Sequence, residues 1–385
     1  MKNKLFLSTI LAACVTCVAQ AETAEEILIK SGNKTYDTLT TNRLQIGDSG
    51  GKGTVTVAGT TTINPNHPGT TSPNACQIQA GSTLVSDTVV FNSSTAAWSH
   101  TFYIFGTVIT NNFAVSAEDG YTADVRVQNK GSIASSSGEA GTGTLVIGKN
   151  ASVNAGSFGG YAANAGSIKV NTEVNNGGIL HVYQNATIEG NLVLNGGSVI
   201  IEPTMAQNAS FSLQEAAIIS DVTVNSGMLR FLGECQTGDI TLNGGEIYFG
   251  ESNVTLSAEG LASTVTTVTT GAMTLNSGTI YVADNYIIDL GGKDLTLSEK
   301  VNIVMSVDSL DNVEGLTVFA EAGNVEGLDK LSVTLVDETG TEKEMAVSYN
   351  SDGSVVTSTI PEPTTATLSL LALAALAARR RRASH

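Results

Sequence analysis

Apolar and polar residues alternate in short bursts along most of this 385-residue chain. Typical bursts begin at Thr54 (TVTV), Thr144 (TLVI) and Leu192 (LVL), and Gly or Asn bounds each of them. A period of two places alternate side chains on opposite faces of a strand, and Gly and Asn favour tight turns. The body of the chain, 22–360, is therefore expected to be all-β, with short strands joined by tight turns.

One phrase recurs along the body: an alternating triplet, then Asn, Gly or Ser, and Gly, and then a second alternating stretch. Copies begin at Leu192, Val222, Ile240 and Met273, and a degenerate copy begins at Val174. The repeat-turn residues are Asn195 and Gly197, Asn225 and Gly227, Asn243 and Gly245, and Asn276 and Gly278. Because Asn and Gly tolerate positive φ, we expect the chain to turn sharply at these positions.

Two architectures use such a turn. In an antiparallel hairpin the turn folds the second strand back on the first, whereas in a parallel β-helix it forms a corner between stacked coils. Counted from Asn175, the repeat asparagines are 20, 30, 18 and 33 positions apart, which suits coils with insertions of variable length. A hairpin sandwich of this size would be large for one domain. The favoured prediction is a parallel solenoid with irregular coils over 22–294.

These repeats resemble the passenger-type right-handed β-helices of autotransporters, including the phrases LQIG at Leu44 and LVIG at Leu145. The resemblance implies a right-handed parallel β-helix. It concerns the repeats alone, because autotransporter secretion needs a C-terminal membrane barrel of many amphipathic strands, and this sequence ends in one short apolar run and arginines.

The segment 295–350 has longer strands and lacks the Asn-Gly corner. Val333 to Val336 and Met345 to Tyr349 flank Asp337-Glu338-Thr339-Gly340, which predicts a hairpin. We expect this segment to be a β cap on the open end of the solenoid, because an open end exposes a strand edge. The segment 351–360 is expected to be a linker.

The last 25 residues have the organisation of a sorting signal. Pro361, Glu362 and Pro363 precede an apolar run from Thr364 to Ala378, which predicts a single hydrophobic helix, and Arg379, Arg380, Arg381 and Arg382 follow. The positive-inside bias would hold the arginines in the cytoplasm and leave the body outside the inner membrane. An ordinary C-terminal anchor would have the same topology.

This tripartite end, 361–385, resembles the PEP-CTERM sorting signal of Gram-negative bacteria. The resemblance implies recognition by an exosortase-type processing enzyme, transient anchoring in the inner membrane, cleavage near Pro361 to Pro363, and transfer to the outer surface or the extracellular matrix. It implies nothing about activity.

The N-terminus, 1–21, predicts a secretory signal peptide. Lys2 and Lys4 precede an apolar stretch, and Ala19-Gln20-Ala21 is an A-x-A cleavage site, so the mature chain would start at Glu22. A competing interpretation takes Leu11 to Cys14 as a lipobox with a lipidated Cys14.

The net charge of the chain limits the classes of molecule that it can bind. Without Lys2, Lys4 and the four tail arginines the chain has 13 basic against 36 acidic residues, a formal charge near −23. Such an acidic surface argues against nucleic acid as a partner.

Cys76 and Cys235 remain after signal removal, and the sequence leaves open whether they are free or form one long-range disulfide.

Residues in catalytic arrangements are scarce, so we expect no enzymatic activity, no cofactor and no metal site. The favoured function is a structural or adhesive protein of the cell surface or matrix, with extracellular polysaccharide or host or envelope glycans as partners. The alternative is a β-helical polysaccharide lyase or glycoside hydrolase. Its candidate acids are Glu202, Glu246 and Glu251, and its candidate sugar-stacking residues are Tyr183, Tyr248, Phe249 and Tyr281. Tyr248 and Tyr281 occupy the same place in successive repeats, and packing is the favoured explanation for them.

Overall fold

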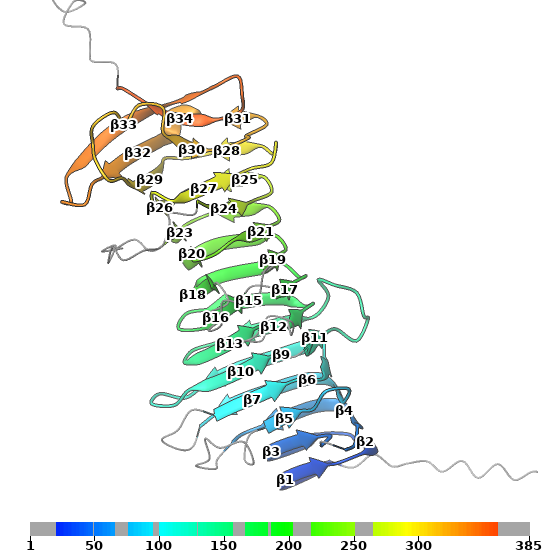
Figure 1. Ribbon diagram of the computed structural model, residues 1–385. Coiled ribbons are helices and arrows are strands. Elements are labelled where there is room, and N and C mark those ends of the chain that lie inside the picture. Colours follow the sequence, from blue (N-terminus) through cyan, green and yellow to red (C-terminus); the bar gives the residue numbers. More distant parts are fainter. Residues whose placement is uncertain are drawn as a thin grey trace, which may run out of the picture.

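A computed structural model describes residues 21–48, 50–65, 76–94, 100–128, 130–156, 166–183, 186–202, 217–250 and 265–360. Its strands stack into a long, narrow body, with β1 at one end and β33 and β34 at the other (Figure 1). Over the described residues there is no α-helix and one short 3-10 helix, η1 (Leu328–Lys330). The prediction of an all-β body is therefore confirmed over the described residues.

Three ladders of parallel strands run the length of the body. Each successive turn of the chain adds one strand, here called a rung, to each ladder. The first ladder contains β1 (Glu22–Ile29), β3 (Leu39–Ile46), β5 (Cys76–Ile78), β7 (His100–Ile104), β10 (Ala123–Val127), β13 (Ala151–Ala155), β16 (Ile179–Tyr183), β18 (Leu192–Glu202), β20 (Val222–Phe231), β23 (Glu246–Phe249), β26 (Thr279–Val282), β29 (Val301–Ser306) and β32 (Leu331–Val336).

The second ladder starts from β3 and contains β4 (Gly53–Ile63), β6 (Thr83–Ser93), β9 (Asn112–Ala117), β12 (Thr144–Ile147), β15 (Asn171–Asn175), β18, β20, β22 (Ile240–Leu242), β25 (Met273–Leu275), β28 (Leu295–Leu297) and β31 (Val325–Glu326). The third contains β2 (Gly32–Tyr36), β4, β6, β8 (Thr107–Ile109), β11 (Ser132–Ala134), β14 (Ser167–Ile168), β17 (Thr187–Ile188), β19 (Ala217–Ile219), β21 (Cys235–Thr237), β24 (Thr266–Thr269) and β27 (Tyr286–Asp289).

The inward side chains of the three ladders form one continuous apolar core. Alternation produces this core directly: in β29, Val301, Ile303 and Met305 are buried while the residues between them are half-exposed. Parallel pairing also stacks like residues, so that the rings of Phe231 and Phe249 lie 4.9 Å apart at an interplanar angle of 8°. Each rung therefore covers the apolar side chains of its neighbours along the stack.

The Asn-Gly turns are corners between parallel strands and not hairpins. β18 and β20 each continue through the turn and pair in parallel on both sides of it. Positive φ is confined to glycine at these corners, at Gly196 (98°), Gly227 (94°), Gly245 (79°) and Gly278 (117°).

The repeat asparagines do not have positive φ, and in the first corner Gly196, not Gly197, has it. Gly197 is needed for close approach instead, because a Cβ there would lie 2.5 Å from Val174 Cγ1 and 2.6 Å from the carbonyl oxygen of Asn175. A Cβ on Gly227 would in turn clash with the carbonyl oxygen of Gly197.

The asparagines form a ladder of side-chain amides instead of adopting the left-handed conformation. Each Nδ2 donates to the Oδ1 of the asparagine one rung before it: Asn195 to Asn175 at 3.4 Å, Asn225 to Asn195 at 2.9 Å, Asn243 to Asn225 at 2.9 Å, and Asn276 to Asn243 at 2.7 Å. The amide suits this place because it both donates and accepts, so an interior asparagine bonds to both neighbouring rungs.

The end of the body departs from the predicted boundaries. The parallel first ladder continues past 295 to β32, and only then does β33 (Glu342–Tyr349) pair antiparallel with it, as the predicted hairpin requires. The predicted linker, 351–360, contains a strand, β34 (Val355–Ser358), which pairs with β33 and with β30 (Thr317–Phe319). The side chains of Val355 and Thr357 are buried, so β34 belongs to the folded C-terminal end of the body.

Both termini lie outside the described residues. This applies to the predicted signal peptide up to Gln20, including Ala19, and to the sorting signal 361–385, including its predicted hydrophobic helix. Ala21 is exposed and directly precedes β1. In the described parts of the chain, no helix has the length and apolar character needed to span a bilayer.

Cys76 and Cys235 are both buried and free. They lie in β5 and β21, and six steps along the first ladder separate their rungs, about 28 Å at ~4.7 Å per strand. A disulfide requires Cα atoms within about 7 Å of each other. The fold therefore keeps the two thiols apart.

We expect both thiols to resist alkylation in the folded protein. Burial raises the pKa of Cys76 to about 11 and that of Cys235 to about 12, so neither forms the reactive thiolate near neutral pH. Iodoacetamide at pH 8 should modify both only after unfolding in guanidinium, as followed by peptide mass spectrometry. Thr334→Cys, at an outward position of β32, serves as the labelled control. A peptide pair linked between Cys76 and Cys235 would contradict the fold.

Candidate functional site

The outward side chains of the first ladder bring polar, charged and aromatic groups together over several rungs. From β10 to β18 these groups form a polar strip, defined here as Asp124, Arg126, Ser152, Asn154, His181, Tyr183 and Glu202. Figure 1 shows the strands that carry the strip, β10, β13, β16 and β18, stacked near the middle of the body. Parallel register aligns Arg126, Asn154 and His181 in one column.

Asp124 bonds to three other side chains of the polar strip, on β10 and β13. Its Oδ2 accepts from Arg126 Nε at 2.6 Å, and its Oδ1 accepts from Ser152 Oγ at 3.1 Å and Asn154 Nδ2 at 2.6 Å. The guanidinium of Arg126 also lies 5.6 Å from the centre of the Tyr103 ring. Because both carboxylate oxygens are bonded, Asp124 holds two rungs and the arginine in place.

His181 and Glu202 form the upper part of the polar strip. His181 Nδ1 lies 2.7 Å from Glu202 Oε1, and the His181 ring is nearly parallel to that of Tyr183, at 6.3 Å. Burial, together with the nearby carboxylate of Glu202, raises the pKa of Tyr183 to about 12. A histidine oriented by a carboxylate at one ring nitrogen can use the other for hydrogen bonding or proton transfer.

Arg230, Tyr248 and Tyr281 form a column further along the same ladder. The guanidinium of Arg230 lies 5.0 Å from the centre of the Tyr248 ring, and the two tyrosine rings stack at 4.5 Å and 8°. The Tyr248 hydroxyl donates to Glu246 Oε2 at 2.7 Å, and burial together with this bond raises the pKa of Tyr248.

Arg230 and Tyr281 cover opposite faces of the Tyr248 ring, because the three residues are in register on β20, β23 and β26. The column therefore stabilises the stacking of rungs by cation–π and aromatic contacts and offers no open face of Tyr248 to a sugar ring. The predicted alignment of Tyr248 with Tyr281 is confirmed, and packing accounts for it.

The remaining predicted sugar-site residues are dispersed. Phe249 points into the core, where it stacks on Phe231, and Tyr183 is also buried, at 6% exposure. Glu202 lies in the polar strip, Glu246 lies beside the tyrosine column, and Glu251 is outside the described residues.

Of the polar strip, sequence analysis named only Tyr183 and Glu202, and it also missed Arg230. Alignment of the repeats would have revealed Arg230. The third residue of the second alternating stretch is Ile200 in one copy, and Arg230, Tyr248 and Tyr281 in the next three. Asp124 and Arg126 lie in coils without the Asn-Gly phrase, so no sequence marker aligned them with His181.

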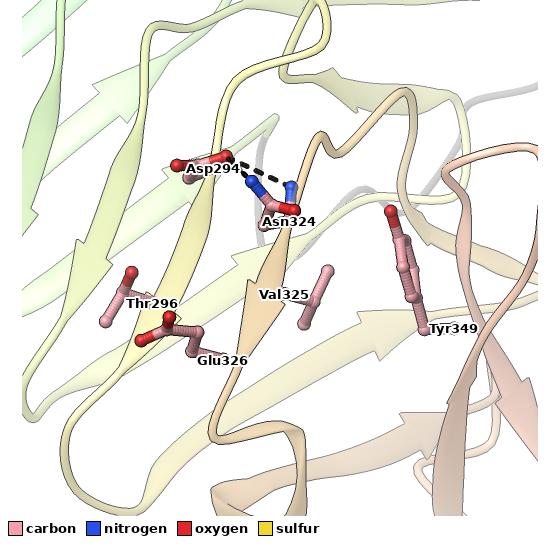
Figure 2. Close-up of a pocket in the computed structure, with 6 residues that line it drawn as sticks. All are labelled: Asp294, Thr296, Asn324, Val325, Glu326 and Tyr349. Carbon is pink, nitrogen blue, oxygen red and sulfur yellow. Dashed lines mark hydrogen bonds between the residues drawn. The ribbon is translucent and has the colours of Figure 1, made fainter.

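A separate pocket of about 390 Å³ lies near the C-terminal end of the second ladder, lined by Asp294, Thr296, Asn324, Val325, Glu326 and Tyr349 (Figure 2). Asp294 Oδ1 accepts from the backbone nitrogen of Asn324 at 3.1 Å and from its Nδ2 at 3.0 Å. The Tyr349 hydroxyl donates to the carbonyl oxygen of Gly323 at 2.7 Å. The Asp294–Asn324 bonds join the ends of β28 and β31, and the Tyr349 bond joins β33 to the residue before Asn324.

Comparison with known proteins identifies the C-terminal end. Residues 359–382 match the family model of the PEP-CTERM protein-sorting motif. The match includes all of the predicted motif residues, from Pro361 to Arg382, and supports export of the chain and its sorting by an exosortase-type enzyme. No curated protein and no solved structure matches the chain.

Proposed function

We propose that this chain is an exported, non-enzymatic β-solenoid that an exosortase-type enzyme delivers to the outer surface or the extracellular matrix, where it binds glycans as a structural or adhesive protein. The observation that carries the proposal is the PEP-CTERM motif at 359–382, attached to a long stack of parallel strands. The signal peptide at 1–21 and a membrane-anchored precursor belong to the same proposal.

The pairing of the strands supports a right-handed parallel β-helix. Successive turns of the chain supply all three ladders in the same order, and the corners at Gly227, Gly245 and Gly278 lie above one another. Connections between parallel strands of one sheet are almost always right-handed, which supports that hand here. The antiparallel strands β33 and β34 would then cap the C-terminal end.

The polar strip supports glycan binding. Arg126, Asn154 and His181 supply donors, and Glu202 supplies an acceptor, along several rungs of one face. Spaced donors and acceptors on a rigid surface suit a hydroxyl-rich polymer that lies along the stack. The formal charge of the whole chain, −17, disfavours polyanions and makes a neutral glycan the better partner.

The alternative, a glycan-cleaving enzyme, is favoured by one observation: His181 and Glu202 make a carboxylate-oriented histidine on the same face as Asp124. However, Asp124 is bonded through both oxygens to Arg126, Ser152 and Asn154, which suits a structural role better than proton transfer.

Incubating the full-length chain, purified in mild detergent, with neutral polysaccharides tests the proposal. We expect saturable binding without shortened oligosaccharides, and about thirtyfold weaker binding after Arg126→Gln combined with His181→Gln, since buried or partly buried polar contacts contribute about 1 kcal/mol each. Val304→Gln with Thr334→Gln, outward on the same ladder, is the matched control. Release of reducing ends that depends on His181 would establish the enzyme instead.

A further inference from the structure

The first rung has an open edge. Among the described residues, β1 pairs only with β3, whereas interior strands of the first ladder have a neighbour on each side. The carbonyl oxygen of Ile29 accepts from Gly47 N at 2.7 Å and so points toward β3. Because successive residues of a strand direct their backbone groups to opposite sides, the backbone groups of Glu26 and Leu28 face the open edge, whereas the carbonyl oxygen of Lys30, just beyond β1, lies against Gly51. The Leu28 side chain is 45% exposed.

We propose that β1 pairs antiparallel with β1 of a second copy of this chain, giving a head-to-head dimer. The opposite end of the body argues for a closed pair and against a filament. There the parallel first ladder ends at β32, and β33 occupies the next position in antiparallel orientation. A head-to-tail contact would need two open ends, whereas two open β1 edges satisfy each other in a closed pair. The edge of β2, which pairs only with β4 among the described residues, is not part of this contact.

Side-chain chemistry selects the register of the pair. With Leu28 opposite Leu28, Glu26 lies opposite Lys30 of the second copy, and Ile27 lies opposite Ile29 on the inward face. Glu26 and Lys30 are exposed, and Ile27 is buried. A shift by one residue in each copy toward the N-terminus would place Glu26 opposite the apolar Leu28 and lose the charge pair, and a shift by two would place two Glu26 side chains opposite each other, which repel. The favoured register joins the two cores and pairs opposite charges.

The predicted maturation of the chain leaves this edge uncovered. The cleavage site Ala19-Gln20-Ala21 would make Glu22 the first residue of the mature chain, and Glu22 is also the first residue of β1. Signal removal would therefore uncover the edge of β1, of which the proposed register uses Glu26 to Ile29 together with the adjoining Lys30. Dimer formation is independent of glycan binding, because the polar strip lies on later rungs of the first ladder.

Cysteine cross-linking tests the register directly. The exported chain should be isolated from producing cells, its N-terminus verified by mass spectrometry, and Leu28→Cys compared with Ile218→Cys under mild oxidation. Residue 28 meets its own copy in the proposed register, whereas Ile218, 53% exposed, lies on the third ladder in the middle of the body. We expect the Leu28→Cys chain to form a covalent dimer at least about ten times faster, since a disulfide requires close Cα atoms. Equal rates would overturn the proposal.

Sedimentation equilibrium of the same exported chain tests the proposed pairing of Glu26 with Lys30 of the second copy. The wild type should be a dimer at about 50 µM, and Lys30→Glu should weaken the dimer by about tenfold, because it places like charges opposite each other. Ile218→Lys should leave the dimer unchanged. A wild-type monomer at this concentration would overturn the proposal, and so would a dimer that Lys30→Glu leaves intact. If the protein were a monomer and its β1 amides still resisted hydrogen exchange, a partner other than a second copy would cover the edge of β1.

Discussion

Gly227→Ala is expected to lower the free energy of unfolding by about 3 kcal/mol or more. Two effects add at this corner. The φ of 94° costs a residue with a Cβ about 1–2 kcal/mol. The new Cβ would also clash with the carbonyl oxygen of Gly197 on the rung before, and overpacking of this kind costs about 1–3 kcal/mol. Guanidinium unfolding of the full-length chain, followed by circular dichroism, measures the change.

Gly120→Ala is the matched control for that variant. Gly120 has a φ of 87°, but no described atom lies within 4 Å of a Cβ built there, so only the conformational cost applies. We expect a loss of about 1–2 kcal/mol. If the two variants were equally stable, the stacking of Gly227 on Gly197 would be wrong, and with it the register of β18 against β20.

The corners were predictable from sequence because their cause is local. Only Gly fits the conformation at Gly227 and Gly245, and alternating residues on both sides indicate strands. The amide ladder was not predicted, although its asparagines were, because an Asn225 side chain bonds to residues 30 and 18 positions away. Sequence spacing alone does not show that these residues lie one rung apart.

The polar strip illustrates the same limit. His181 and Glu202 are 21 positions apart, and Asp124 bonds to Asn154 across 30 positions. Each of these contacts requires the register of coils that differ in length, and no repeat phrase marks the coil of Asp124. β34 was missed for a related reason: Val355 to Ser358 is a short apolar stretch beside Gly353 and Asp352, which suggests a linker until its partners β30 and β33 are known.

Deleting Arg379–Arg382 is expected to abolish correct delivery of the chain, with at least a tenfold fall in the protein accessible at the cell surface. These residues close the segment that matches the PEP-CTERM protein-sorting motif. Four arginines after an apolar run fix its orientation, since basic residues are retained on the cytoplasmic side, and their loss removes that bias. Surface protease accessibility, with membrane fractionation, measures the effect.

Two further variants separate orientation from enzymatic recognition. Replacing the four arginines with lysines keeps the positive charge, so the orientation of the precursor should be retained. Glu362→Gln removes the charge of the Pro-Glu-Pro motif without altering the arginines, and it should leave an oriented precursor whose C-terminus is still His385, as determined by mass spectrometry. Wild-type processing of the Glu362→Gln chain would show that an exosortase-type enzyme does not depend on this motif here. Normal surface delivery without Arg379–Arg382 would mean that the body reaches the surface by a route independent of the sorting signal.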